Sequence, residues 1–371
     1  MQDKKWRELL KPYQKKNDFI AFWQIASTTL AYAGVWYWYS FYAHESLLWS
    51  VPFAFLASMF LLRFFVLMHD CGHRAMFSKG WANRFFGYFS GAIVGMPQYV
   101  WSKHHSYHHN TNGDWEKYKG PLTTISVGEY ENLSPKSQKR YWAVRKAPLL
   151  LPGGFVYILF NPRFNWLKGL VQWALRVVSS VFKPGTSTLA QIKNLESRYW
   201  KTPKEFWHMT YNNLTLIFLI WPLMINWLGH AAFWPMYVLS ISLAGAFGIL
   251  FFTLQHNFED SYASDTDRVS FEKAALEGTS FLDFPWPLTW FTADIGYHHI
   301  HHLSSTIPNY QLKRCHKALS DRFGAVTRIG LFEIPKHTNC LLWDEVNEKI
   351  ISRGVYEASK SVSSSEAATT V

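Results

Sequence analysis

The chain has 371 residues, of which 18% are aromatic and only 17% are charged, and its mean hydropathy is -0.10. The low charge argues against an ordinary soluble protein and the hydropathy against a wholly embedded bundle, so we expect membrane spans joined to a large polar part. The net charge of +11 favours contact with anionic lipid or an acidic protein partner. No nucleic-acid-binding motif accompanies the basic residues, and we predict no nucleic-acid partner.

The first segment, residues 1–18, is rich in lysine and is followed by the first apolar run. It is too charged and too long before that run to be a cleaved signal peptide. We predict a basic amphipathic arm that lies on a membrane surface.

Four segments are apolar enough to cross a bilayer, which takes roughly 20 apolar residues in a helix. They are residues 19–43, 47–68, 212–228 and 231–254. Short turns connect them into two antiparallel hairpins. Arg63 lies near the C-terminal end of the second span, and its side chain would extend to the membrane–water interface. Neither turn contains Lys or Arg, so the positive-inside rule places both termini and the long middle segment in the cytoplasm.

Two more apolar stretches are interpreted as segments that do not cross the membrane. Residues 149–182 contain Arg163, Lys168 and Arg176, which favours a pair of helices at the interface. Residues 85–101 are short and rich in glycine, and they would separate two histidine motifs if they crossed. We predict that they lie in the interface or re-enter the same face.

These segments predict the domain organisation. The spans and a helical cytoplasmic cap, formed by about 69–208 and 255–319, would make one domain over residues 19–319. Residues 320–358 would complete the cap. The tail, residues 359–371, is polar and low in complexity, and we predict that it is disordered.

Three short clusters, HDCGH, HSYHH and HHIHH, hold most of the histidines. The first spaces two histidines four apart, and the other two follow an i, i+3, i+4 pattern, so each cluster presents imidazoles on one helix face. A further histidine follows the last predicted span. The nine candidate metal ligands are His69, His73, His105, His108, His109, His256, His298, His301 and His302.

Imidazole binds zinc, copper, iron and nickel, and nine rings exceed the four ligands of one tetrahedral ion, so we predict two metal ions. The predicted fold class is therefore an all-α membrane protein: four transmembrane helices with a large helical cytoplasmic cap that holds a histidine-rich di-metal site. Metal-bound histidines usually donate their second N–H to a carboxylate, carbonyl or water. The side chains near enough in sequence to accept it are Asp70, Asn110, Asn257, Glu259 and Asp294.

The remaining histidines are predicted not to bind metal. His104 and His299 lie beside ligands but off the shared face. Solitary histidines are more often ordinary polar residues than ligands. That interpretation applies to His44, His208, His230, His316 and His337.

The chain resembles the membrane fatty acid desaturases. Their first box has the form H-x(3 or 4)-H and the other two H-x-x-H-H, as in the three clusters above, and the resemblance runs from about Leu47 to Leu319. The strings QHNFED, FLDFPWPLTWFTADIGYHHIHHL and TIPNY look like the bacterial and cyanobacterial omega-6 (delta-12) acyl-lipid branch.

The resemblance implies a non-haem di-iron site whose ligands would be the nine histidines. It implies insertion of a cis double bond into an acyl chain, at delta-12 in that branch, with dioxygen as co-substrate and two external electrons. Membrane lipid is the favoured acyl carrier, with coenzyme A or carrier protein as alternatives. The protein would be a multi-pass protein of a bacterial inner membrane with a cytoplasmic active site.

The electron donor would be a separate protein, either a ferredoxin or a small b-type cytochrome with its reductase. The sequence LPGG at residues 151–154 is similar to the haem motif of fused cytochrome domains. Leucine replaces the axial histidine there, so we interpret the match as chance.

Two other functions compete with desaturation. A related hydroxylase or oxygenase of lipids, alkanes or carotenoids would share the histidine boxes and yield an oxygenated product. A metal transporter would place polar ligands near the bilayer midplane. Here the histidines lie outside the predicted spans, which disfavours transport.

Overall fold

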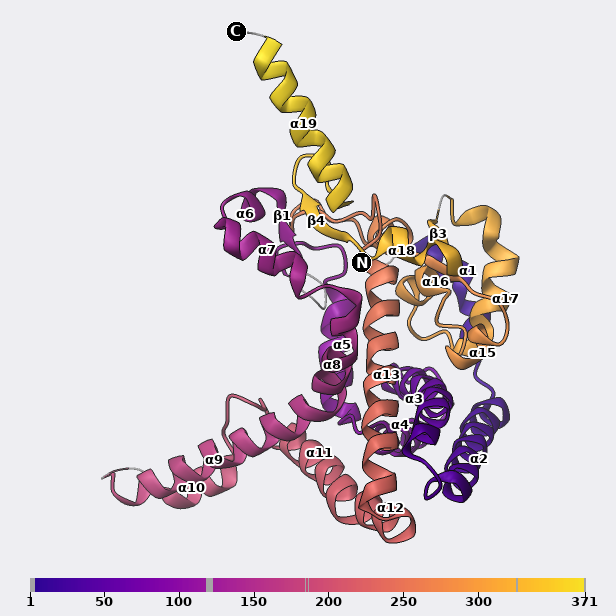
Figure 1. Cartoon of the computed structure of the whole chain (residues 1–371), viewed down its shortest axis with the longest axis vertical. Helices are drawn as coiled ribbons and strands as arrows, with labels where there is room; N and C mark the ends of the chain where they lie inside the picture. Colours follow the sequence, from indigo (N-terminus) through magenta and orange to yellow (C-terminus); the bar gives the residue numbers. More distant parts are fainter. Residues whose placement is uncertain (1–3, 118–122, 184, 186, 325, 370–371) are drawn as a thin grey trace. The chain divides into compact units, whose positions relative to one another are not determined.

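The computed structural model describes residues 4–117, 123–183, 185, 187–324 and 326–369 (Figure 1). The chain divides into two compact units, each discontinuous in sequence. Unit 1 comprises Met1–Lys16, Ser106–Leu150 and Phe247–Val371, and unit 2 comprises Asn17–His105 and Leu151–Ala246. Two helices, α5 (Gln98–Asn110) and α13 (His230–His256), begin in unit 2 and end in unit 1.

The regular secondary-structure elements among the described residues of unit 2 are all helices. Besides the first parts of α5 and α13, its helices are α2 (Asp18–Tyr42), α3 (Ser50–Gly72), α4 (Gly80–Val94), α8 (Leu150–Phe155), α9 (Asn161–Val181), α10 (Thr188–Asn194), α11 (Pro203–Leu214) and α12 (Trp221–Leu228). Helix α3 packs against both α2 and α4, and Figure 1 shows the three side by side. Asn17 caps α2 by accepting from the backbone N–H groups of Phe19 and Ile20.

Among the described residues, two helices are long and apolar enough to cross a membrane, Leu47–Gly72 and His230–His256. A third arises only if the successive helices Pro135–Ala143 and Ala147–Val181 form one broken span. The first two contain predicted spans. Polar residues dilute α2, and the remaining predicted segment is divided between α11, a π-helical turn and α12. The four-span arrangement therefore stays a prediction.

Arg63 lies differently from its predicted position at the interface. Its side chain is buried against α2, where Nε donates to the Thr28 hydroxyl at 3.0 Å and Nη2 to the Gln24 amide oxygen at 3.2 Å. Both partners are neutral, so the guanidinium links two neighbouring helices by hydrogen bonds rather than by an ion pair.

The two ambiguous apolar stretches fold in different ways. Residues 85–101 are broken between α4 and α5 by a turn at Gly95, whose φ of 85° suits glycine. Residues 149–182 were predicted to be a pair of helices, and this is wrong in form. They make one helical run, in which the π-helical segment Val156–Phe160 joins α8 to α9. The bonds of Arg163 to the carbonyls of Ile158 and Leu159 stabilise that segment.

The glycines of the LPGG sequence have a packing role. A Cβ atom added to Gly154 would lie 2.4 Å from backbone atoms of Ser242 and Ala246, and one added to Gly245 would lie 2.5 Å from the Gly154 Cα. Helices α8 and α13 therefore cross backbone to backbone at these two glycines. This contact gives a structural reason for a sequence that otherwise resembles a haem motif.

Unit 1 combines short helices with two small sheets. Its helices are α1 (Lys4–Leu10), α6 (Val127–Glu131), α7 (Pro135–Ala143), α14 (Phe271–Leu276), α15 (Leu288–Phe291), α16 (His298–Leu303), α17 (Asn309–Leu319), α18 (Ile334–His337) and α19 (Arg353–Thr369). Its strands are β1 (Ile125–Ser126), β2 (Phe281–Asp283), β3 (Arg328–Gly330), β4 (Cys340–Asp344) and β5 (Lys349–Ser352).

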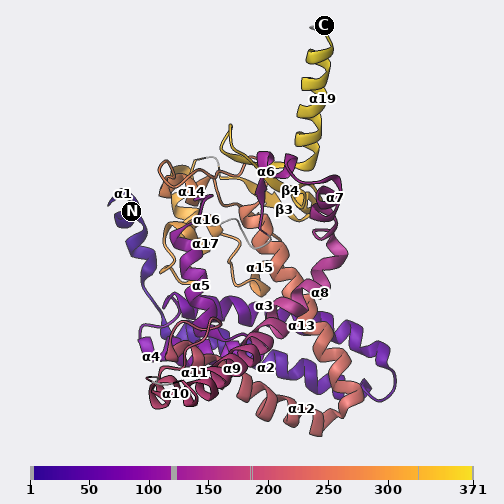
Figure 2. The ribbon, with the colours of Figure 1, turned by 90° about the vertical axis from the view of Figure 1, so that its left-hand side faces the viewer.

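Both sheets bring together segments that are far apart in the chain. Strand β4 pairs parallel with β1, with Ile125 opposite Leu342, and antiparallel with β5. Strands β2 and β3 pair in parallel, with Leu282 opposite Ile329. Helix α6 packs against β4, as Figure 2 shows. The sheets thereby join the C-terminal strands β3 and β4 to β1, which follows α5, and to β2, which precedes α16.

The chain ends differ from their predictions. Residues 1–3 lie outside the described residues, but α1 buries Trp6 and Leu10 in the core of unit 1, where Trp6 stacks on Phe323 at 5.6 Å. Its apolar face is thus covered by protein, which differs from an arm that presents this face to a membrane. Most of the tail that was predicted to be disordered belongs to α19, which continues to Thr369; residues 370–371 lie outside the described part.

Candidate metal centre

Four buried histidines converge in unit 1. His108 comes from α5, His256 from the end of α13, and His298 and His302 from successive turns of α16. One ring nitrogen of each lies within 4.8 Å of those of the others. The His256 and His298 Nε2 atoms are 2.9 Å apart, and those of His298 and His302 are 3.1 Å apart. We call these four residues the histidine tetrad.

The tetrad has the donor chemistry of a transition-metal site. Burial lowers the pKa of His302 well below its usual range, and the neighbouring rings of His109 and His298 lower it further, so the ring is neutral. With metal–nitrogen distances of about 2.1 Å, nitrogens bound at right angles would be roughly 3.0 Å apart. The separations of 2.9 and 3.1 Å between the Nε2 atoms agree with that geometry.

The environment of His256 also fits a ligand role. Its ring is buried, and its Nε2 atom is directed at that of His298. The ring of Phe252, one turn earlier on α13, contacts both His108 at 5.0 Å and His256 at 4.8 Å.

Two further histidines of unit 1 form a close pair beside the tetrad. The Nε2 atoms of His109 and His301 are 3.0 Å apart, and the ring of His109 stacks on that of His302 at 4.2 Å. The i, i+3, i+4 spacing therefore divides the three predicted ligands of α16 between the tetrad and this pair.

Unit 2 brings together His69, His73 and His105. The ring centroids are 4.7 Å apart for His69 and His73, 4.5 Å for His69 and His105, and 5.1 Å for His73 and His105. The Asp70 carboxylate lies 2.9 Å from the His69 Nδ1 atom, and both side chains are buried. This is the arrangement in which a carboxylate orients a ligand histidine.

Of the five side chains predicted to support ligands, Asp70 is the one for which such a contact is described. Asn257 donates to the Thr124 hydroxyl at 2.9 Å, and the Glu259 carboxylate accepts from the Ser352 backbone at 3.1 Å. Both residues thus have other partners. Asn110 is exposed at the end of α5, and Asp294 has a positive φ in the turn that precedes α16.

The two histidines that sequence left off the ligand face occupy other surroundings. His104 is exposed on α5. His299 is buried but points away from the tetrad, since its Nε2 atom lies 3.1 Å from Nδ1 of His316 and its ring contacts Phe323. His316, interpreted as an ordinary polar residue, is therefore part of a half-buried histidine pair.

Two aromatic contacts were not predicted from the sequence. Trp101 stacks on His105 with centroids 4.6 Å apart and planes 14° apart, and Phe252 packs against His256. Each aromatic residue precedes its histidine by four positions on a helix. That spacing places the two side chains on one face and is a signal that sequence reading can use.

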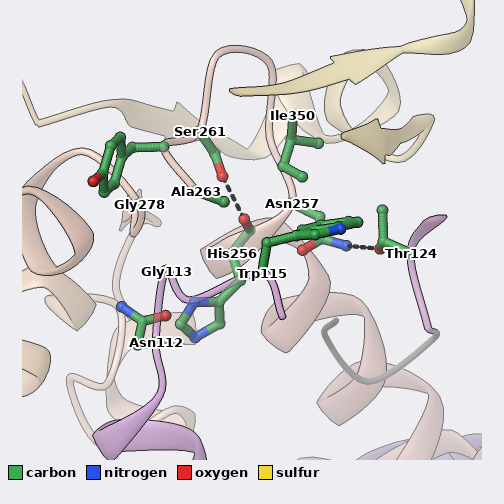
Figure 3. A pocket seen from close by; sticks show the side chains of 11 residues that line it. Asn112, Gly113, Trp115, Thr124, His256, Asn257, Ser261, Ala263, Gly278 and Ile350 are labelled. Atoms are coloured by element: carbon green, nitrogen blue, oxygen red, sulfur yellow. Dashed lines mark hydrogen bonds between the residues drawn. The ribbon is translucent and has the colours of Figure 1, made fainter. Parts of the chain in front are cut away.

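A small pocket adjoins the tetrad from the side of His256 (Figure 3). Its volume is about 40 Å³, and Asn112, Thr124 and Asn257 contribute polar atoms to its lining. A cavity of this size has room for about two or three water molecules. The pocket can therefore hold water next to the tetrad, on the side where Ser261 donates to the His256 carbonyl at 2.6 Å.

Comparison with known proteins agrees with these features. The profile of the family described as fatty acid desaturase matches residues 46–329. A fatty acid desaturase of Bacillus subtilis is 28% identical over 344 residues, covering 91% of this chain and 86% of the relative. An sn-1 oleoyl-lipid 12-desaturase of a Picosynechococcus species is 26% identical, covering 74% and 70%, and one of Anabaena variabilis is 24% identical, covering 81% and 77%.

The family match covers the two helices able to span a membrane and all nine histidines. It extends over most of the chain, so it does not rest on the histidine motifs alone. The chain belongs to the fatty acid desaturase family and is an oxidoreductase.

Proposed function

We propose that the protein inserts a cis double bond into the acyl chain of a membrane lipid at a di-iron centre. The observation that carries the proposal is the histidine tetrad, whose buried imidazoles form a set of nitrogen donors at metal-binding separations. An iron centre would supply the oxidising power to remove two hydrogens from an unactivated chain, which no ordinary side chain can do.

The nine predicted histidines would share two iron ions. The tetrad would hold one ion. The Asp70 carboxylate beside His69 supports a ligand role for that ring.

The reaction is a four-electron reduction of dioxygen. The acyl chain gives up two hydrogens, an external donor supplies two electrons, two protons come from solvent, and dioxygen leaves as two water molecules. A ferredoxin, or a small b-type cytochrome with its reductase, would supply the electrons. The net charge of +11 favours an acidic donor.

Position and acyl carrier are proposed from the relatives. The Picosynechococcus and Anabaena proteins are named sn-1 oleoyl-lipid 12-desaturases, and the Bacillus protein is named without a position. We therefore propose a lipid-linked acyl chain and a delta-12 double bond, at a centre on the cytoplasmic side of a four-span protein of a bacterial inner membrane. The two described helices that are long and apolar enough to cross a membrane support an integral membrane location.

Expression in a host with a simple lipid profile, together with a ferredoxin and its reductase, tests the proposal. We expect a new double bond, found by mass spectrometry with double-bond localisation, and a delta-12 diene when oleoyl lipid is present. The His302→Ala variant serves as the inactive control. A hydroxylated product would replace desaturase by hydroxylase, and an unchanged profile with iron-loaded protein and reduced ferredoxin would contradict both.

Replacing Asp70 by asparagine tests the orientation of His69. The amide keeps the size of the side chain but loses the carboxylate that accepts the Nδ1 proton. We expect the iron affinity and the desaturase activity each to fall about 10- to 100-fold. Asp260→Asn, at an exposed ion pair with Lys349, is the matched control and should change neither. Equal losses in both variants would remove Asp70 from this role.

A further inference from the structure

An apolar groove with a basic rim lies along helix α9 in unit 2. Phe164, Leu167, Val171 and Leu175 form its apolar wall, and Tyr199 faces them from the segment that follows α10. Its volume is about 830 Å³, which falls within the roughly 300–1,000 Å³ typical of ligand sites. No residue of the proposed iron centre lines it.

The groove is a built feature. A Cβ atom on Gly169 would lie 2.0 Å from the Trp200 ring, so α9 and the segment around Trp200 pack closely. The Gln172 amide oxygen accepts from the Arg198 backbone at 2.8 Å, which ties the two walls together. The groove therefore keeps its width without a bound molecule.

The apolar wall continues as a stripe along α9. Val171 is 59% exposed and Leu175 is 64% exposed, and Val178 and Phe182 extend the same face. A continuous apolar face of this length on one side of a helix is typical of contact with a membrane or a partner. Lys168 and Arg176 lie within the helix, and charges are costly in the hydrocarbon core, so the interfacial depth of a bilayer suits it better than a span.

Three basic side chains at the rim of the groove, Lys168, Arg176 and Arg198, favour an anionic ligand. Lys168 lies over the Phe164 ring at 4.0 Å, Arg176 makes only a long ion pair of 3.8 Å with Glu196, and Arg198 bonds to the Tyr199 hydroxyl at 2.8 Å. These contacts hold three positive charges beside an apolar channel with one nearby carboxylate. A molecule with a long apolar chain and an anionic head satisfies both parts of the groove.

We propose that the α9 groove binds an anionic phospholipid of the bilayer, with an acyl chain along Leu167, Val171 and Leu175. The phosphate and its neighbouring headgroup oxygens accept from Lys168, Arg176 and Arg198. Arginine suits this role because its planar fork matches phosphate oxygens in pairs. The site is separate from the proposed desaturation, and its occupancy is independent of iron or electrons.

Photolabelling of the full-length protein tests the site. The protein is placed in nanodiscs that contain equal amounts of phosphatidylglycerol and phosphatidylcholine, with one or the other carrying a diazirine in its acyl chain. After irradiation, labelled peptides are mapped by mass spectrometry. We expect phosphatidylglycerol to label residues 164–179 and 198–199 more strongly than phosphatidylcholine does.

Charge reversal supplies the specific control. In K168E/R176E/R198E we expect the preference for phosphatidylglycerol at α9 to fall about tenfold, since each basic residue near an anionic surface contributes separately. The matched variant K136E/K139E/R140E makes the same charge change on exposed residues of α7 and should keep the preference. Equal labelling by both lipids, or a preference that survives the α9 reversal or disappears equally in the α7 variant, would overturn the proposal.

Discussion

Replacing His302 by alanine is expected to abolish desaturation and to remove iron. The side chain is buried in the tetrad, with Nε2 3.1 Å from that of His298, and alanine offers no donor in its place. Replacing a residue that only orients a metal ligand lowers metal affinity or activity about 10- to 100-fold. We therefore expect replacement of the ligand itself to lower both by more than about 100-fold. Fatty acid analysis of cells and metal analysis of purified protein measure both effects. The same result is expected for His298→Ala and His301→Ala.

His104→Ala is the matched control for this series. His104 adjoins His105 on α5 but is exposed, and substitutions at such surface positions usually change little. We expect iron content and activity of this variant to stay within about twofold of the wild type. Full activity of His302→Ala would end its assignment as a ligand. Equal loss in His104→Ala would show that the clusters serve folding rather than metal binding.

Adding one methyl group at Gly245 is expected to destabilise the protein strongly. A Cβ atom there would lie 2.5 Å from the Gly154 Cα and 2.6 Å from the Gly154 carbonyl oxygen, so α8 and α13 would have to separate. Overpacking against backbone costs about 1–3 kcal/mol and occasionally more. The midpoint of thermal unfolding, followed by size-exclusion of the detergent-solubilised protein after heating, measures the loss.

Gly248→Ala gives this experiment its control on the same helix. No atom lies within 4 Å of a Cβ placed at Gly248, and alanine is the better helix former by about 1 kcal/mol. We expect its unfolding midpoint to equal or exceed that of the wild type. If Gly245→Ala proved as stable as Gly248→Ala, the close crossing at Gly154 would not exist in the folded protein.

The sequence predicted the histidine groups because helical spacing is local information. His298 and His302 had to share a face of any helix that contained both, and the structure has them on successive turns of α16. The convergence of His108 with His256 is a tertiary contact, which spacing alone does not determine. The sequence suggested it only through the predicted order of spans and the family resemblance.

The predictions that failed depended on which partner covers an apolar face. The periodicity of α1 predicts an apolar face that includes Trp6, but it does not say whether protein or membrane covers that face. The structure shows that protein covers it, because Trp6 stacks on Phe323. The continuous run through α8 and α9 was missed because three basic residues, Arg163 among them, favoured a pair of helices at the interface. The charge of Arg163 is instead satisfied inside the protein, by amide oxygens of Asn212 and Asn213 at 2.8 Å.

The discontinuity of unit 1 has a consequence for biosynthesis. At about 5–20 residues per second, the roughly 190 residues between His108 and His302 take on the order of 10–40 s to synthesise. During that time the tetrad around His108 is incomplete, so the proposed metal site can form only after most of the chain has left the ribosome. Burial of helix α1 comes later still, because Trp6 stacks on Phe323, which is synthesised after His302. The first helix to be synthesised is therefore among the last to be buried.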